Sequence, residues 1–160
     1  MTFEVRPAHA DETPLPGEDP RVYARRIARA KATAVAGDAV LAADTVVALD
    51  GRIFGKPGDP PEARAMLRAL SGRTHLVHTA VCLRASRTYE RLVTSRVTFR
   101  ALTERDVAWY LATGEPFDKA GGYGIQGDGA LLVDRLQGSY TNVMGLPLRE
   151  TLALLDRIAR

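Results

Sequence analysis

The chain has 160 residues, 46% hydrophobic and 26% charged, which is the balance of a globular domain large enough to bury a core. Its 22 basic and 19 acidic residues are interspersed, so the net charge of +3 forms no basic stripe for duplex nucleic acid. The single cysteine, Cys82, excludes an internal disulfide and fits a reducing cytoplasm. No apolar run has membrane-spanning length, and the polar start is unlike a signal peptide. We therefore expect one cytoplasmic domain over residues 1–160.

The first half of the chain alternates between strand and helix signals. Asp19-Pro20 has the cap-then-proline pattern of a helix start, and Asp50-Gly51 is a strong hairpin signal. The apolar run between them is typical of a buried strand. The predicted elements are a strand at Phe3–Arg6, a helix from Pro20 to before Gly37, strands at Val40–Leu49 and Arg52–Phe54, and a helix from Pro60 to about Leu70.

The second half adds an antiparallel strand pair and two further helices. The pattern predicts strands at His75–Arg84 and Tyr89–Phe99, a helix from Thr103 to near Gly114, a short strand at Leu131–Val133 and a helix at Pro147–Ile158. Leu148, Leu152 and Leu155 are spaced to form the docking face of that last helix. The mixture predicts an α/β fold with a mixed, twisted sheet flanked by helices.

Asp44 is the first candidate for chemistry. It interrupts the apolar run Val40–Leu49, and a carboxylate inside a buried strand is costly unless it is paired, hydrogen-bonded or bound to a metal. The alternative is a strand end at which the side chain meets solvent. Thr45 beside it could bond a ligand, although threonine is also common in strands.

The three lysines are the second candidates. In a chain rich in arginine, Lys31, Lys56 and Lys119 are the only lysines, which suggests positions that need a compact ammonium group to contact phosphate or carboxylate. Solvated side chains remain the alternative for each of them.

The segment Asp118–Ala130, DKAGGYGIQGDGA, is too rich in glycine for a helix and too polar for a core. It matches neither the phosphate-binding pattern GxxxxGK[ST] nor the dinucleotide pattern GxGxxG. Its glycines could serve tight turns alone, or they could let the backbone approach a ligand. Gln126 carries both a donor and an acceptor, as reading a nucleobase edge requires.

Taken in chain order, these segments resemble the Maf family of nucleoside triphosphate pyrophosphatases. The resemblance covers nearly the whole chain and rests on Asp11-Glu12, ARAKA around Lys31, LAADTVV around Asp44, GKP around Lys56, LSGRTH at Leu70–His75, GEPFDKAGGYGIQGDGA at Gly114–Ala130 and GSYTNVMGLPL at Gly138–Leu148. It implies a fold similar to that of the inosine triphosphate pyrophosphatases, and it suggests a homodimer.

The resemblance implies cleavage of a nucleoside triphosphate between its α and β phosphates, with a divalent cation such as Mg²⁺ or Mn²⁺. The implied catalytic residues are Asp44, Glu12, Lys31 and Lys56; the implied substrate-binding residues are Thr45, Lys119 and Gln126; the implied metal ligands are Asp44, Glu12 and Asp118. Whether Asp44 accepts a proton from water or ligates the metal stays open. Thr45 followed by GIQG is similar to the branch that acts on dTTP, UTP and modified pyrimidine triphosphates. No stable nucleic-acid or membrane partner is implied.

One departure from the family pattern leads to a second hypothesis. The family usually begins with a strand and a loop of the type ASxSPRR, whose serine and arginines contact phosphate, and the sequence printed here starts at a later strand. We expect that adding such a segment would raise activity and solubility. The alternative function is a non-catalytic or weakened nucleotide-binding protein with a regulatory role linked to septation.

Overall fold

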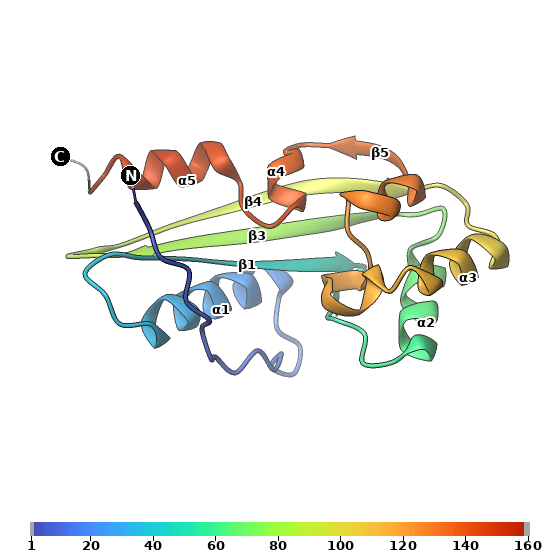
Figure 1. The fold of residues 1–160 in the computed structure, drawn as a ribbon, viewed down its shortest axis with the longest axis horizontal. Coiled ribbons are helices and arrows are strands. Elements are labelled where there is room, and N and C mark those ends of the chain that lie inside the picture. The colour runs from blue at the N-terminus through green and yellow to red at the C-terminus, as the bar shows by residue number, and fades with distance from the viewer. Residues whose placement is uncertain (1, 159–160) are drawn as a thin grey trace.

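A computed structural model describes residues 2–158. Its centre is a five-stranded sheet in the order β2-β1-β3-β4-β5 (Figure 1). The elements are α1 (Pro20–Ala34), β1 (Val40–Leu49), β2 (Arg52–Phe54), α2 (Pro60–Leu70), β3 (Thr74–Arg84), β4 (Thr88–Phe99), α3 (Glu104–Ala112), β5 (Val133–Gln137), α4 (Tyr140–Val143) and α5 (Leu148–Leu155), with short 3-10 turns at Glu115–Asp118, Ala120–Gly122 and Gly127–Leu132.

The local signals in the sequence act as predicted. The Asp19 carboxylate accepts hydrogen bonds from the first amides of α1, and Thr103 forms a capping box with Asp106 at the start of α3. Asp50 and Gly51 adopt φ values of 52° and 78°, the left-handed pair that a tight hairpin turn needs between β1 and β2.

The predicted α/β class, a sheet flanked by helices, is confirmed. Every strand pair among residues 2–158 is antiparallel, so the parallel pairing that a mixed sheet would include is not part of the described sheet. β1 pairs with β3 along most of its length, whereas β2 pairs only with Val47–Leu49. Within the described residues, the stretch of β1 before Val47 is therefore an edge of the sheet.

The two faces of the sheet are covered by different helices, and the alternation of side chains decides which residue faces which. Val46, Ala80 and Cys82 pack against α1. Val81 and Leu83, one residue out of phase, pack against Leu154 of α5. Asp44 shares the α1 face with Val46, and Thr45 lies on the opposite face.

At the far end of the long strands, α2, α3 and the glycine-rich segment gather around one core (Figure 1). His75, Phe99 and Tyr123 meet edge to face there, with ring centroids 4.6–5.4 Å apart. The core fixes Tyr123, and hence the glycine-rich segment, against the sheet.

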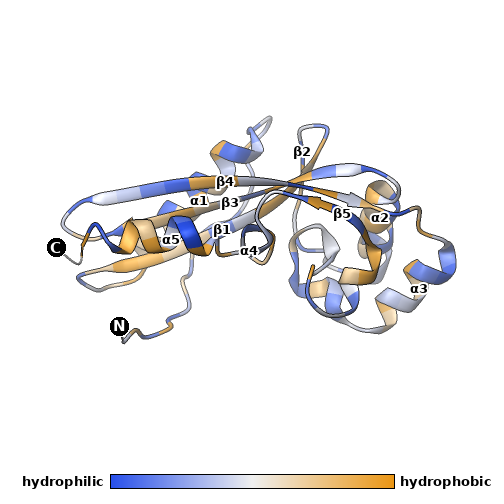
Figure 2. Ribbon diagram, turned by 90° about the horizontal axis from the view of Figure 1, so that it is seen from above, coloured by the Kyte–Doolittle hydropathy of each residue, from blue (hydrophilic) through white to orange (hydrophobic). Residues whose placement is uncertain are grey.

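Three predicted details are wrong. Phe3–Arg6 forms no strand, because it pairs with no other described segment, and Phe3 and Val5 are more than 80% exposed. Leu148 and Leu152 are exposed, since α5 turns Thr151 and Leu154 inward instead; Figure 2 shows hydrophobic and hydrophilic stretches along its ribbon. Leu131 lies in a 3-10 turn, and the strand begins at Val133.

None of the helices over residues 2–158 combines the length and hydrophobicity needed to cross a membrane.

His75 is expected to make folding sensitive to acid. Its side chain is 1% exposed, and burial lowers its pKa from 6.5 to about 4. Between these values the unfolded chain binds a proton that the folded chain does not, so the free energy of unfolding falls as pH drops from 6.5 to about 4. The contribution is up to about 1.4 kcal/mol per pH unit.

We predict that the free energy of unfolding falls less steeply over that pH range in His75→Gln, which keeps a partner for the Tyr123 hydroxyl. Urea unfolding at several pH values is the measurement. His9→Gln, at an exposed position, is the control. An unchanged slope in His75→Gln would contradict this assignment.

Candidate active site

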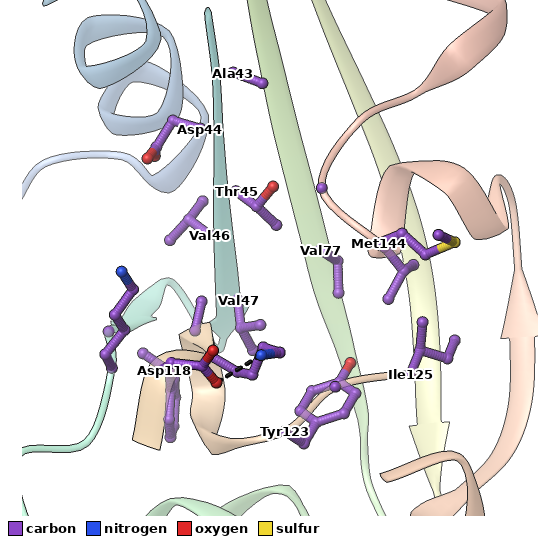
Figure 3. Close-up of a pocket in the computed structure, with 18 of the residues that line it drawn as sticks. Ala43, Asp44, Thr45, Val46, Val47, Val77, Asp118, Tyr123, Ile125 and Met144 are labelled. Carbon is purple, nitrogen blue, oxygen red and sulfur yellow. Dashed lines mark hydrogen bonds and ion pairs between the residues drawn. The ribbon is translucent and has the colours of Figure 1, made fainter. Parts of the chain in front are cut away.

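One cavity among the described residues has a volume of about 700 Å³, within the range of about 300–1,000 Å³ typical of ligand pockets. It opens beside the free edge of β1 and is lined by the loop before α1, by α1 itself, by the turn after β2, by the glycine-rich segment and by the turn after α4 (Figure 3). Each sequence-predicted site residue lines it: Glu12, Lys31, Asp44, Thr45, Lys56, Asp118, Lys119 and Gln126. Segments far apart in sequence therefore meet at one site.

Lys31 bridges two carboxylates in the wall of this cavity. Its ammonium Nζ lies 2.8 Å from Asp44 Oδ1 and 2.9 Å from Glu12 Oε1. Asp44 is 7% exposed, Lys31 20% and Glu12 42%, so the group runs from the sheet interior outward to solvent. The pairing resolves the problem that the sequence raised, because the buried carboxylate has its cation.

Glu12 reaches the cavity because α1 holds its loop. The Tyr23 hydroxyl donates to the Glu12 carbonyl oxygen at 2.8 Å, and the Arg26 guanidinium donates to the Thr13 carbonyl at 3.0 Å. Arg26 is itself fixed by two 2.7 Å bonds to the Glu18 carboxylate. Sequence reasoning missed Tyr23, although its spacing of eight residues before Lys31 places both on one helix face.

Burial opposes the charged form of both partners in this ion pair, and the pKa of each ends up raised. Burial raises the pKa of Asp44, and this outweighs the hydrogen bond from Lys31, which lowers it. For Lys31, burial pulls the pKa down, but the hydrogen bonds to Asp44 and Glu12 leave its pKa raised. The site thus keeps a charged lysine beside a carboxylate that binds a proton more readily than an ordinary aspartate.

A second group of charges lies on the other side of the cavity. Lys119 is ion-paired with Asp118, which is exposed, and this pairing lowers the pKa of that carboxyl (Figure 3). The positive charge of Lys56 also favours the ionised form of Asp118 and of Asp44, although burial still leaves the pKa of Asp44 raised. Lys56 and Lys119 are both exposed to solvent, where an anion can reach them.

The glycine-rich segment forms a wall of the cavity and depends on its glycines. Gly121, at a φ of 72°, lies so close to β1 that a Cβ atom would approach Val47 to 2.9 Å. Gly129 would bring a Cβ against the Gly124 carbonyl at 2.0 Å. The Glu115 carboxylate accepts bonds from the amides of Asp128 and Gly129, at 3.1 and 3.2 Å. Nothing in the sequence pattern singled out Glu115.

Gln126 and Thr45 lie on that wall and on β1, respectively. Gln126 is exposed, and its side chain makes no hydrogen bond within residues 2–158, which leaves its amide available to a ligand. Thr45 bonds to Thr79 at 2.9 Å, and Figure 3 shows its side chain directed away from that of Asp44.

The donor set fits a divalent cation in part. Asp44 Oδ2 is buried and accepts no hydrogen bond, so one oxygen of the inner carboxylate is open to a cation or a water molecule. The Glu12 carboxylate lies nearby, because Lys31 pairs with both Glu12 and Asp44. In the part of the chain that the structure describes, no three acidic, histidine or cysteine side chains group as a metal site.

Comparisons with known proteins agree with this geometry. The family model described as Maf-like protein matches residues 1–158. A dTTP/UTP pyrophosphatase of Anaeromyxobacter dehalogenans (strain 2CP-1) is 52% identical, over 98% of this chain and 84% of its own length. That of Myxococcus xanthus is 53% identical over 98% and 82%, and that of Thermus thermophilus 52% over 89% and 75%.

An antiparallel sheet, with a cavity at its edge that gathers three lysines and a buried carboxylate, defines an α/β protein equipped for a small anionic ligand. The match over residues 1–158 and the identities above 50% identify the family. The chain belongs to the Maf family.

We predict that Lys31→Met destabilises the protein by about 2 kcal/mol, less than the about 3–5 kcal/mol typical of breaking a fully buried pair because Lys31 is partly exposed. Asp44 would be left as a buried charge without its cation, so the loss should shrink when Asp44→Asn is added. Urea unfolding at pH 8 measures both variants.

Arg29→Met on the same helix is the matched control, because its pair with Glu90 lies at the surface and should contribute less than about 1 kcal/mol. Equal losses in the Lys31 and Arg29 variants would contradict the importance of burial at Lys31.

Proposed function

We propose that this protein is a nucleoside triphosphate pyrophosphatase that hydrolyses dTTP, UTP and modified pyrimidine triphosphates to the monophosphate and pyrophosphate. The names of its relatives, all dTTP/UTP pyrophosphatases at about half identity, support the substrate class. The geometry supports a charge-neutralising, proton-accepting site of the kind that this hydrolysis needs.

The observation that carries the proposal is the state of Asp44. Its Oδ1 is held by Lys31 at 2.8 Å, and its Oδ2 is buried without a partner. A fixed carboxylate with a raised pKa and one free oxygen at a cavity wall is suited to accept a proton from an attacking water. An aspartate kept only for structure would have both oxygens satisfied.

The remaining charges supply positioning. Lys56 and Lys119 line the cavity with exposed ammonium groups, which can neutralise the oxygens of a triphosphate. Lys31 holds Asp44 and Glu12 in place, and its hydrogen bond favours the ionised form of Asp44 against the effect of burial. The amide of Gln126 can both donate to and accept from a base edge, which matches the alternating donor and acceptor groups of uracil and thymine.

A divalent cation, Mg²⁺ or Mn²⁺, would be held by Asp44 and Glu12 and would supply charge neutralisation and a more acidic water. Lys31 occupies Asp44 Oδ1 and Glu12 Oε1, so Asp44 Oδ2 stays open to such a cation or to a water molecule.

The non-catalytic alternative gains no specific support from the geometry. A protein that only bound nucleotide would need the lysines and Gln126, whereas hydrolysis also needs a proton acceptor, which the open oxygen of Asp44 supplies. The assembled Asp44, Lys31 and Glu12 favour the enzyme.

We predict that Asp44→Asn lowers kcat for dTTP hydrolysis at least about 100-fold, because general acid–base groups typically contribute about 10²–10⁴-fold. Pyrophosphate release with Mg²⁺ or Mn²⁺ is the measurement, and thermal unfolding checks that the variant is folded. Asp38→Asn, a change at an exposed aspartate, is the matched control and should retain full activity. Near-wild-type turnover by folded Asp44→Asn would overturn the role given to Asp44.

A further inference from the structure

Thr45 and Thr79 form a cross-strand pair between β1 and β3. They are directly opposite in the register, and their hydroxyl oxygens are 2.9 Å apart. Thr79 is 0% exposed, whereas Thr45 is partly exposed and lines the cavity. The pair therefore connects the buried interior of the sheet to the ligand site.

The direction of this hydrogen bond follows from the next one. Thr79 Oγ1 donates to the main-chain carbonyl oxygen of Asn142 at 2.8 Å. A hydroxyl has one proton, so Thr79 can only accept from Thr45. The Thr45 proton is then directed to Thr79, and Thr45 presents only lone pairs to the cavity.

The carbonyl that sets this direction is firmly held. The Asn142 side chain, 0% exposed, donates from Nδ2 to the Val77 carbonyl at 3.1 Å and to Ser95 Oγ at 2.9 Å. The amide of Asn142 in turn donates to Ser139 Oγ. Because α4 is tied to β3 and β4 in this way, Asn142 cannot easily release Thr79.

The approach to Thr45 from the cavity is kept open by Gly145, which also lines the cavity. Gly145 has a φ of 107°, and a Cβ atom there would lie only 3.4 Å from Thr45 Oγ1. In Figure 3, Thr45 is directed toward the side of Val77 and Met144, whereas Asp44 is directed toward α1. Its hydroxyl thus serves a different part of the cavity from the carboxylate.

We infer that Thr79, held by the Asn142 carbonyl, is a positioning residue that makes Thr45 a hydrogen-bond acceptor only, so that Thr45 contacts a donor group of the nucleoside and not the triphosphate. This inference rests on the proposed function. Triphosphate oxygens at neutral pH are acceptors and gain nothing from Thr45 so oriented. The donors on dTTP and UTP are the sugar hydroxyl groups and the ring N3–H of thymine or uracil.

The test compares three triphosphates: dTTP, its 3′-deoxy analogue without the sugar hydroxyl, and its N3-methyl analogue without the ring N–H. The wild-type protein should lose about tenfold in kcat/KM with whichever analogue lacks the donor that Thr45 accepts, as expected for one hydrogen bond of about 1.4 kcal/mol. The analogue that shows the loss identifies the donor.

Thr79→Val removes the acceptor and leaves the Thr45 proton free to turn. We expect its KM for dTTP to rise about tenfold with kcat within about twofold, and we expect it to treat dTTP and the sensitive analogue alike. Thr79→Ser keeps the hydroxyl and should restore discrimination. Ser95→Ala is the control, because it loosens the same polar network without touching the contact between Thr45 and Thr79.

The inference would be overturned if Thr79→Val discriminated between dTTP and the sensitive analogue as strongly as the wild type does. It would also be overturned if Thr79→Val lowered kcat/KM, relative to the wild type, by the same factor for all three triphosphates. If Thr79→Val does not fold, Thr45→Val, at a partly exposed position, replaces it. This variant should likewise treat dTTP and the sensitive analogue alike. If no triphosphate is hydrolysed, the proposed function fails. The inference is then decided by calorimetric affinities of dTMP and the two corresponding monophosphate analogues.

Discussion

The structure of the site depends on one constraint: a carboxylate in the middle of a buried strand must be given a cation. Asp44 cannot turn to solvent, because β1 places it on the face covered by α1. Lys31 meets it from that helix, and Glu12 on the loop fixed by Tyr23 shares the ammonium group. The ion pair thus joins the strand, the helix and the N-terminal loop, and it leaves Asp44 with one oxygen for chemistry.

The edge of the sheet explains how a single cavity receives two kinds of group. Asp44 and Thr45 are adjacent and therefore face opposite sides of β1. Over residues 2–158 no strand pairs with this part of β1 on its outer side, so both faces border one cavity. Charge comes from the α1 side, and the directed hydroxyl of Thr45 comes from the α4 side. The glycine-rich segment forms a wall of the cavity because Gly121, at positive φ, packs directly on Val47.

Much of this was predictable from the sequence, for identifiable reasons. Helix starts and the hairpin were predicted because Asp19-Pro20 and Asp50-Gly51 act locally. Phe3–Arg6 alternates like a strand, but alternation alone does not supply a pairing partner. The outer face of α5 was misjudged because Leu148 and Leu152 have the right spacing, whereas the packing of Leu154 decides which side is buried. Asp44 and Lys31 were recognisable, but Thr79 and Asn142 act through register and hydrogen-bond direction, which spacing does not encode.

The central claim is that burial, which outweighs the opposing effect of Lys31, gives Asp44 the proton affinity of a working base. Its most direct test is the pH dependence of kcat/KM for dTTP in the wild-type protein and in Glu12→Gln. The negative charge of Glu12 raises the pKa of Asp44, so its removal should lower that pKa. With the same substrate in both assays, ionisation of the nucleotide cancels in the comparison. The account predicts that kcat/KM of the wild type falls on the acid side with a midpoint above the ordinary aspartate pKa of about 3.9. In Glu12→Gln this midpoint should move to lower pH. A midpoint that stays in place would contradict it.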